Sequence, residues 1–251
     1  MHRVRDDARR KVTDSLGSQK RESSTISHPR RARQGRPRRK RFSTTEIRDL
    51  SIASILVVLV GISVFGNSLG IVNAIAIVGS YISSNQWWVV VGVIGLFLAS
   101  FMAHELAHKF VSQHYGMWSE FRMTSMGYYL SAMAILFSIP IFGTGAVYTS
   151  GTGTREQIGK SNAAGPLTNF AIAASLAIIS IVLSLAGILY PLGVLLRYGV
   201  QLNAFLGLFN MIPIQPFDGA TVRDWDQRIW IALTIGLLFM LIFGYVMYPF
   251  L

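Results

Sequence analysis

Apolar residues gather in long runs beyond residue 49, and short polar segments separate these runs. The hydrocarbon core of a bilayer takes a helix of about 20 residues, and five of the runs approach or exceed that length. They span residues 50–65, 87–111, 163–189, 195–211 and 229–246. The pattern predicts an all-α polytopic membrane protein with about five to six transmembrane helices.

Two further apolar segments fit a simple crossing less well. Residues 71–83 are short and contain Asn73 and Ser80, which favours an interfacial or re-entrant segment. Residues 126–147 contain Pro140 and several glycines, and basic residues flank them on both sides. A segment with cytosolic ends crosses an even number of times, so we expect a re-entrant or extended loop here. A further helix is the alternative.

Positive charge is concentrated at the N-terminus. Residues 1–48 hold 16 Lys and Arg against 5 Asp and Glu, whereas residues 49–251 hold 7 of each sign. Residues 1–48 lack apolar periodicity, which predicts a disordered basic tail, and the positive-inside rule places this tail in the cytosol. Residues 49–251 then form the membrane-embedded domain of an integral multi-pass protein, which we expect in the cell membrane.

Three roles compete for the basic tail. We favour a topology signal, and an electrostatic tether to anionic lipids is the second interpretation. Nucleic-acid binding ranks last because no aromatic residues are interleaved with the arginines, so no nucleic-acid partner is expected. The chain contains no cysteine, which excludes disulfides, thiol catalysis and cysteine-based zinc sites.

His104-Glu105-Leu106-Ala107-His108 ends the apolar run that starts at Trp87, where ionisable groups are costly. Histidines four residues apart share one face of a helix and bind one Zn²⁺ ion, and the glutamate between them acts as general base. The same string arises by chance in soluble helices. Its apolar surroundings favour the metal site, because unpaired His and Glu would be strongly destabilising there. His114 lies past the expected helix end and is not expected to be a ligand.

Zinc with two histidine ligands needs a third protein ligand and an open position for water. The candidate is Asp218, which ends the motif Asn210-Met-Ile-Pro213-Ile-Gln-Pro216-Phe-Asp218-Gly219. Its prolines break the helix, and irregular backbone at membrane depth is buried in protein or lines a wet cavity. In the predicted topology Asp218 reaches the same depth as His108. The alternative is a proline-rich loop in which Asp218 caps a helix.

Together these residues resemble the site-2 protease family of intramembrane zinc metalloproteases. That family pairs His-Glu-x-x-His with a later Asn-x-x-Pro-x-x-Pro-x-Asp-Gly, and a Gly-Pro-x-x-Asn element such as Gly165–Asn169 lies between them. Gly145-Ala146-Val147 resembles the end of a Pro-Gly-Ala-Val stretch, although Thr144 replaces the proline and Phe217 replaces a leucine. The resemblance covers residues 87–251 and implies a minimal member without a PDZ or CBS domain.

The resemblance implies one Zn²⁺ ion on His104, His108 and Asp218, with Glu105 as the catalytic base and a transmembrane protein or peptide as substrate. It also implies substrate contacts for Asn169 and Asn210, for which helix–helix hydrogen bonds are an equal alternative. From the residues themselves, we expect the segment GAVYTSG, which starts with Gly145, Ala146 and Val147, to hold an extended substrate by strand addition.

Two other functions compete with proteolysis in the membrane. A zinc-binding transporter would use the same histidines along an ion path, but such a path does not need Glu105. A prenyl-protein-type protease also carries His-Glu-x-x-His, but it uses a glutamate as third ligand, and no later apolar run contains one. The sequence therefore predicts an intramembrane zinc metalloprotease, and the resemblance implies that it acts in regulated intramembrane proteolysis.

Overall fold

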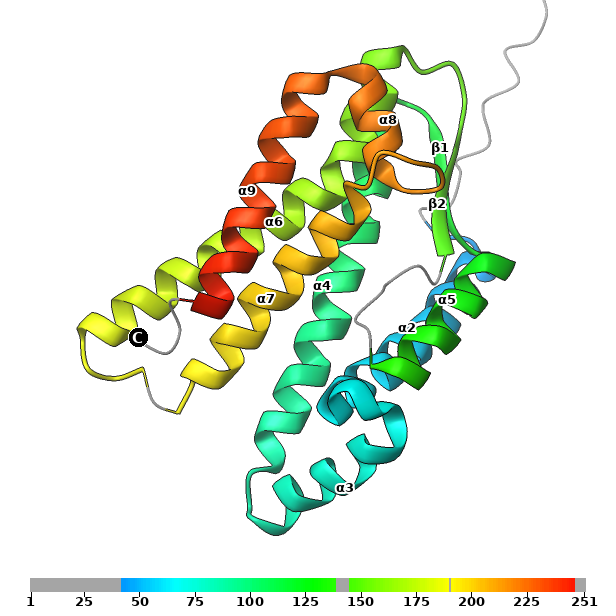
Figure 1. Cartoon of the computed structure of the whole chain (residues 1–251). Coiled ribbons are helices and arrows are strands. Elements are labelled where there is room, and N and C mark those ends of the chain that lie inside the picture. Colours follow the sequence, from blue (N-terminus) through cyan, green and yellow to red (C-terminus); the bar gives the residue numbers. More distant parts are fainter. Residues whose placement is uncertain (1–41, 139–144, 190, 247–251) are drawn as a thin grey trace, which may run out of the picture. The chain divides into compact units, whose positions relative to one another are not determined.

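The structure, a computed structural model, describes residues 42–138, 145–189 and 191–246. These residues form helices and one two-stranded antiparallel sheet (Figure 1). In chain order the elements are α2 (Thr44–Ser63), the 3-10 helix η1 (Val64–Leu69), α3 (Gly70–Ser83), α4 (Trp87–His114), β1 (Trp118–Met123), α5 (Ser125–Phe137), β2 (Gly145–Ser150), α6 (Arg155–Leu185), α7 (Gly193–Asn210), α8 (Asp218–Trp225) and α9 (Gln227–Val246).

The protein is an all-α polytopic membrane protein, as predicted. Four helices in the described ranges are long and apolar enough to cross a membrane, and these are α2, extended to Gly66, α4, α6 and α9. The expected fifth crossing corresponds to α7, which is 18 residues long and carries Arg197, Gln201 and Asn203 among its apolar residues. Composition alone therefore does not mark α7 as a span.

Helix α4 lies between two groups of helices (Figure 1). Helices α6 and α7 pack against it and against each other, and α9 packs on both. Helix α2 packs against α4 separately and also contacts α3 and α5. The sheet contacts α4 near its C-terminal end, where Figure 1 also shows α8. This end of α4 carries the two histidines of the sequence motif.

Two apolar clusters hold these groups together. The larger cluster includes Val57 and Val60 of α2 with Val93 and Phe97 of α4, all of them at most 2% exposed. The smaller cluster joins Met211, which directly follows α7, with Val222 of α8 and Leu237 of α9. Between helices in a bilayer such contacts are stabilised by van der Waals packing, because lipid tails are as apolar as these side chains. The helices that carry the predicted metal ligands, α4 and α8, are therefore packed against buried apolar side chains.

The expected boundary between tail and membrane domain at residue 48 is too late. Helix α2 begins at Thr44, and the Ser43 side chain caps it by accepting the Glu46 N–H at 3.1 Å. Glu46 is fully buried and Asp49 nearly so, and both contact β1. Residues 42–48 are thus part of the folded domain. The prediction of disorder for residues 1–41 lies outside the described residues.

The segment at residues 126–147, for which we expected a re-entrant or extended loop, has more regular secondary structure than expected. Its central part is the helix α5, and the extended part that we predicted is the strand β2, which pairs with the unpredicted strand β1. Residues 139–144 lie outside the described ranges. A further correction concerns His114, which is the last residue of α4, three residues beyond the expected helix end at Val111.

Candidate metal centre

The two histidines and Asp218 converge on one point. His104 and His108 lie one turn apart on α4, and their Nε2 atoms are 3.0 Å apart. The Oδ2 atom of Asp218 lies 3.4 Å from the His104 Nε2 and 3.1 Å from the His108 Nε2. A tetrahedral zinc ion with Zn–N bonds of about 2.0–2.1 Å keeps its ligand atoms roughly 3.3 Å apart. The three side chains therefore have the spacing of a zinc site.

The protons of the two imidazoles point away from this point of convergence. The His108 Nδ1 lies 2.7 Å from the Ser161 carbonyl oxygen, and the His104 Nδ1 lies 2.5 Å from the Asn169 Oδ1. Since both partners accept hydrogen bonds, each neutral imidazole carries its proton on Nδ1 and directs a lone pair from Nε2. Asp218 Oδ2 is buried and has no hydrogen-bond partner among the described residues. Three electron-pair donors thus face one another, an arrangement that a bound cation stabilises.

Asp218 reaches the histidines because it is the first residue of α8. A Cβ atom on Gly219 would lie 2.2 Å from the Met211 carbonyl oxygen, so only glycine lets α8 start directly against the end of α7. Burial alone would raise the pKa of the Asp218 carboxyl. When the neighbouring imidazoles are protonated, their charges, with that of His108 first, favour the carboxylate and lower this pKa below its ordinary value.

Gly165 forms the floor of the centre. A Cβ atom on Gly165 would lie 2.3 Å from the His108 Nε2 and 2.7 Å from the His104 Cε1. Helix α6 can therefore approach the two imidazoles closely only because residue 165 has no side chain. The sequence singled out Gly165 only as a part of the Gly-Pro-x-x-Asn resemblance, and the structure supplies its physical reason.

Glu105 lies beside the three ligands at the edge of a cavity of about 140 Å³. The cavity is bounded by α4, the strand β2, the start of α6, and the loop between α7 and α8. Its lining residues are His104, Glu105, His108, Ser112, Gly145, Ala146, Val147, Thr149, Ser161, Asn162, Asn210, Pro216 and Asp218. The cavity therefore joins the ligand cluster, the carboxylate of Glu105 and one edge of the sheet.

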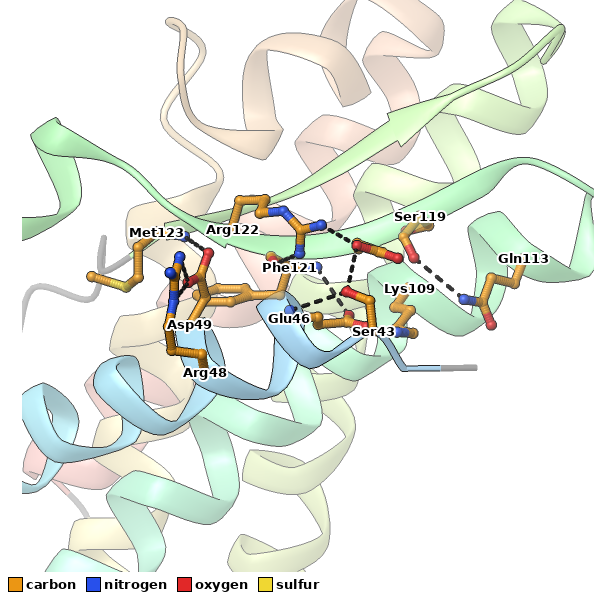
Figure 2. A network of polar contacts seen from close by, with 11 residues as sticks. Ser43, Glu46, Arg48, Asp49, Lys109, Gln113, Ser119, Phe121, Arg122 and Met123 are labelled. Carbon is orange, nitrogen blue, oxygen red and sulfur yellow. Dashed lines mark hydrogen bonds and ion pairs between the residues drawn. The ribbon is translucent and has the colours of Figure 1, made fainter. Parts of the chain in front are cut away.

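The far edge of the sheet is closed by side chains, as Figure 2 shows. The outward N–H groups of Phe121 and Met123 in β1 donate to the carboxylates of Glu46 at 3.0 Å and Asp49 at 3.2 Å. The Arg122 side chain donates to the outward carbonyl group of Phe121 at 3.0 Å, and the Gln113 side chain donates to that of Ser119 at 3.3 Å. Strand β1 thus has polar partners on both of its edges.

The closure of β1 determines which backbone groups of β2 face the cavity. Phe121 and Met123 lie opposite Val147 and Gly145 in the antiparallel register, and Ser119 lies opposite Thr149. Opposite residues in an antiparallel pair both point inward or both point outward. The N–H and C=O groups of Gly145, Val147 and Thr149 therefore point away from β1, and these three residues line the cavity. The backbone of Ala146 is instead paired with Arg122.

The two asparagines predicted to contact substrate have different positions. Asn210 lines the cavity and donates to the Leu206 carbonyl at 3.0 Å. Asn169 is fully buried behind His104, and its amide nitrogen donates to the Asn203 Oδ1 at 3.0 Å. In the structure the Asn169 amide contacts His104 and Asn203, and the substrate role stays a prediction. Its interhelical hydrogen bonds match the alternative interpretation.

Sequence reasoning missed four polar residues around the centre. Glu46 and Asp49 close the sheet, while Ser100 and Asn203 form a buried chain with Asn169. Ser100 and Asn203 interrupt apolar runs, and polar residues in such runs are usually functional or paired. That signal was available in the sequence. The contacts of Glu46 and Asp49 depend on residues more than 70 positions away, which no local pattern reveals.

Comparison with known proteins agrees with this centre. The chain is 34% identical to "Putative zinc metalloprotease MJ0611" of Methanocaldococcus jannaschii over 210 residues, which are 83% of this chain and 96% of that relative. The chain belongs to the site-2 protease family of zinc metalloproteases. Another relative, "Putative zinc metalloprotease Rip3" of Mycobacterium tuberculosis, is 30% identical over 146 residues, 57% of this chain and 32% of its own length. No family model and no solved structure matches.

Membership in the site-2 protease family accounts for the motifs found in the sequence. The two histidines, Asp218 and Gly165 come from motifs that are far apart in the chain, and the structure assembles them within one small volume. The donor set of two imidazoles and one carboxylate suits zinc. The residues present therefore fit the metal that the family name states.

Proposed function

We propose that the protein is an intramembrane zinc endopeptidase, which hydrolyses peptide bonds in or near transmembrane segments of membrane proteins. The observation that carries this proposal is the cavity, which combines three convergent ligand atoms, the carboxylate of Glu105 and a backbone edge. The histidines and Glu105 belong to α4, a helix long and apolar enough to cross a membrane. Regulated intramembrane proteolysis is the role that we propose for it.

The residues of the cavity divide the chemistry between them. His104, His108 and Asp218 would hold one zinc ion, which polarises the scissile carbonyl and makes a bound water more acidic. Glu105 accepts a proton from the attacking water on its carboxylate and then donates it to the nitrogen of the leaving amine.

Substrate binding follows from the edge of β2. A transmembrane helix hides its amides in internal hydrogen bonds, so the scissile segment unwinds before water attacks it. An extended segment then adds to β2 by main-chain hydrogen bonds. The backbone N–H and C=O groups of Gly145, Val147 and Thr149 are available for these bonds, because those of Ala146 are paired with β1. The Ser112 hydroxyl lies 3.3 Å from the Thr149 hydroxyl and links the edge to α4.

The proposal is tested with the full-length protein in lipid vesicles together with a single-pass transmembrane reporter. We expect cleavage inside or close to the reporter's apolar segment, loss of cleavage with a zinc chelator, and recovery when zinc is added back. Mass spectrometry of the fragments locates the cut. Cleavage confined to a long soluble loop of the reporter would contradict the proposed substrate class.

The same vesicles separate proteolysis from transport. A zinc-sensitive dye inside the vesicles reports uptake during the cleavage assay. Zinc uptake in the absence of reporter cleavage would support the competing function, a transporter that uses the same histidines. Cleavage without uptake would support the protease.

A further inference from the structure

A chain of buried polar groups runs from α7 through α6 to the metal centre. It links Ser100 of α4, Asn203 of α7, Asn169 of α6 and His104 of α4, each at most 3% exposed. We propose that Asn203 is a positioning residue for the metal centre, which fixes the Asn169 amide so that His104 keeps the tautomer with a free Nε2 lone pair. This proposal rests on the metal site proposed above, but not on proteolysis.

The direction of the chain is set by a group that cannot donate. The Asn203 side chain lies 2.9 Å from the Gly199 carbonyl oxygen, which only accepts hydrogen bonds. The atom of Asn203 that faces Gly199 is therefore the nitrogen Nδ2, which also donates to the Ser100 hydroxyl at 2.9 Å. The reversed amide would place two oxygens against each other. The Oδ1 atom of Asn203 consequently points toward Asn169.

The next two groups follow this polarity. Asn203 Oδ1 accepts from the Asn169 Nδ2 at 3.0 Å, so the Asn169 Oδ1 faces His104. An amide oxygen in that position accepts a proton from His104 Nδ1 and leaves Nε2 with its lone pair. A reversed Asn169 would donate to Nδ1 and place the proton on Nε2, where it would block a metal bond. The tautomer of His104 thus depends on Asn203, which does not touch it.

His108 obtains the same tautomer in another way. Its Nδ1 faces the backbone carbonyl of Ser161, whose orientation is fixed by α6. Asn169 has a side-chain amide that can rotate, so it needs a second partner to hold it. Partners in the second layer of a metal site orient the ligands, and their loss typically weakens metal binding by about 10 to 100-fold. The difference between the two histidines explains why a polar Asn203 lies in the apolar interior.

Three variants of the full-length protein test this inference. Asn203→Leu removes both the donor and the acceptor and keeps the number of side-chain heavy atoms and their branching at Cγ. Asn203→Asp keeps an oxygen toward Asn169 and, when protonated, a donor toward Gly199. Ser100→Ala removes the end of the chain but leaves the Gly199 contact, which makes it the matched control. Zinc affinity is measured by competition with a chelator, and ¹⁵N NMR of ring-labelled histidine reports the His104 tautomer in metal-free protein.

We expect Asn203→Leu to weaken zinc binding by about 10 to 100-fold and to lose the preference for a protonated Nδ1 at His104. Asn203→Asp and Ser100→Ala should keep both properties within about threefold of the original protein. An unchanged tautomer and zinc affinity in a folded Asn203→Leu protein would overturn the proposal. Should the original protein bind no zinc, the proposed metal site fails, whereas the tautomer measurement still decides the role of Asn203.

Discussion

At Gly165 the metal centre has no room for a side chain. Gly165→Ala would place a methyl group within 2.3 Å of the His108 Nε2, so either α6 or the imidazole must move. We predict that this variant loses most of its bound zinc while it remains folded. Zinc content is measured on purified protein. The control is Gly95→Ala on α4, where an added Cβ meets no atom within 4 Å, and equal zinc loss in both variants would contradict the account.

Asp218 is the one ligand that the histidine motif does not supply. Asp218→Ala removes an ionised oxygen from the centre, and two imidazoles alone bind zinc weakly, so we predict loss of zinc together with loss of cleavage. Metal analysis decides this. Asp224→Ala is the matched control, because Asp224 is an exposed residue of the same short helix. Full zinc occupancy in Asp218→Ala would return Asp218 to the role of a helix cap.

One buried ion pair joins α2 to α4, and its carboxylate also contacts β1. Lys109 Nζ pairs with the Glu46 carboxylate, and these two side chains are 1% and 0% exposed (Figure 2). The centre of the Phe42 ring lies 3.9 Å from Lys109 Nζ. Glu46 also accepts the Phe121 N–H. A buried charge that loses its partner typically destabilises a protein by about 3–5 kcal/mol, whereas removal of both charges together is often neutral.

The difference between removal of one charge and removal of both gives a prediction for the packing of α2 against α4. We expect Lys109→Met to destabilise the protein by about 3–5 kcal/mol, and we expect the double variant Glu46→Gln with Lys109→Met to recover most of that loss. The glutamine oxygen keeps the bond to Phe121. Thermal unfolding in detergent measures both. The exposed pair of Glu156 and Lys160 serves as control, and a double variant no more stable than Lys109→Met would show that the ion pair does not join these elements.

The elements most visible in the sequence are those with local signals. Runs of apolar residues predicted the long helices, and the spacing of His104 and His108 predicted their shared face. The sheet was only half predicted, because β1 (WSEFRM) has no strong alternation and is held by Glu46 and Asp49 from α2. Such long-range contacts leave no mark on either segment. The hydrogen bond between Asn169 and Asn203 was not predicted for the same reason, since the two residues lie 34 positions apart.

At the scale of the whole molecule, the described part of the membrane domain begins at Phe42. We predict that removal of residues 1–41 leaves zinc content and detergent-solubilised cleavage unchanged, because α2, its cap Ser43 and Glu46 remain. Removal of residues 1–48 should cause loss of both, since it deletes Phe42, the cap and the buried carboxylate. Both truncated proteins are compared with the full chain. Equal activity of the two would contradict the contribution of residues 42–48.

The basic tail itself should act at the membrane surface. Its Lys and Arg residues attract anionic lipid by about 1 kcal/mol each when held near the surface, so the protein without residues 1–41 should bind anionic lipid headgroups less strongly. Binding of soluble anionic lipid analogues to detergent-solubilised protein measures this. If instead cleavage is lost while protease mapping shows unchanged orientation, the tail takes part in catalysis or substrate capture.

The central claim is that a zinc site and Glu105 together hydrolyse peptide bonds in a membrane. The most direct test is the rate of reporter cleavage by Glu105→Gln in lipid vesicles, measured beside its zinc content. Glutamine cannot accept the proton of the attacking water, so we predict one zinc ion per chain, as in the original protein, and a fall in rate of about 10² to 10⁴-fold. Cleavage by Glu105→Gln at the original rate would contradict the account.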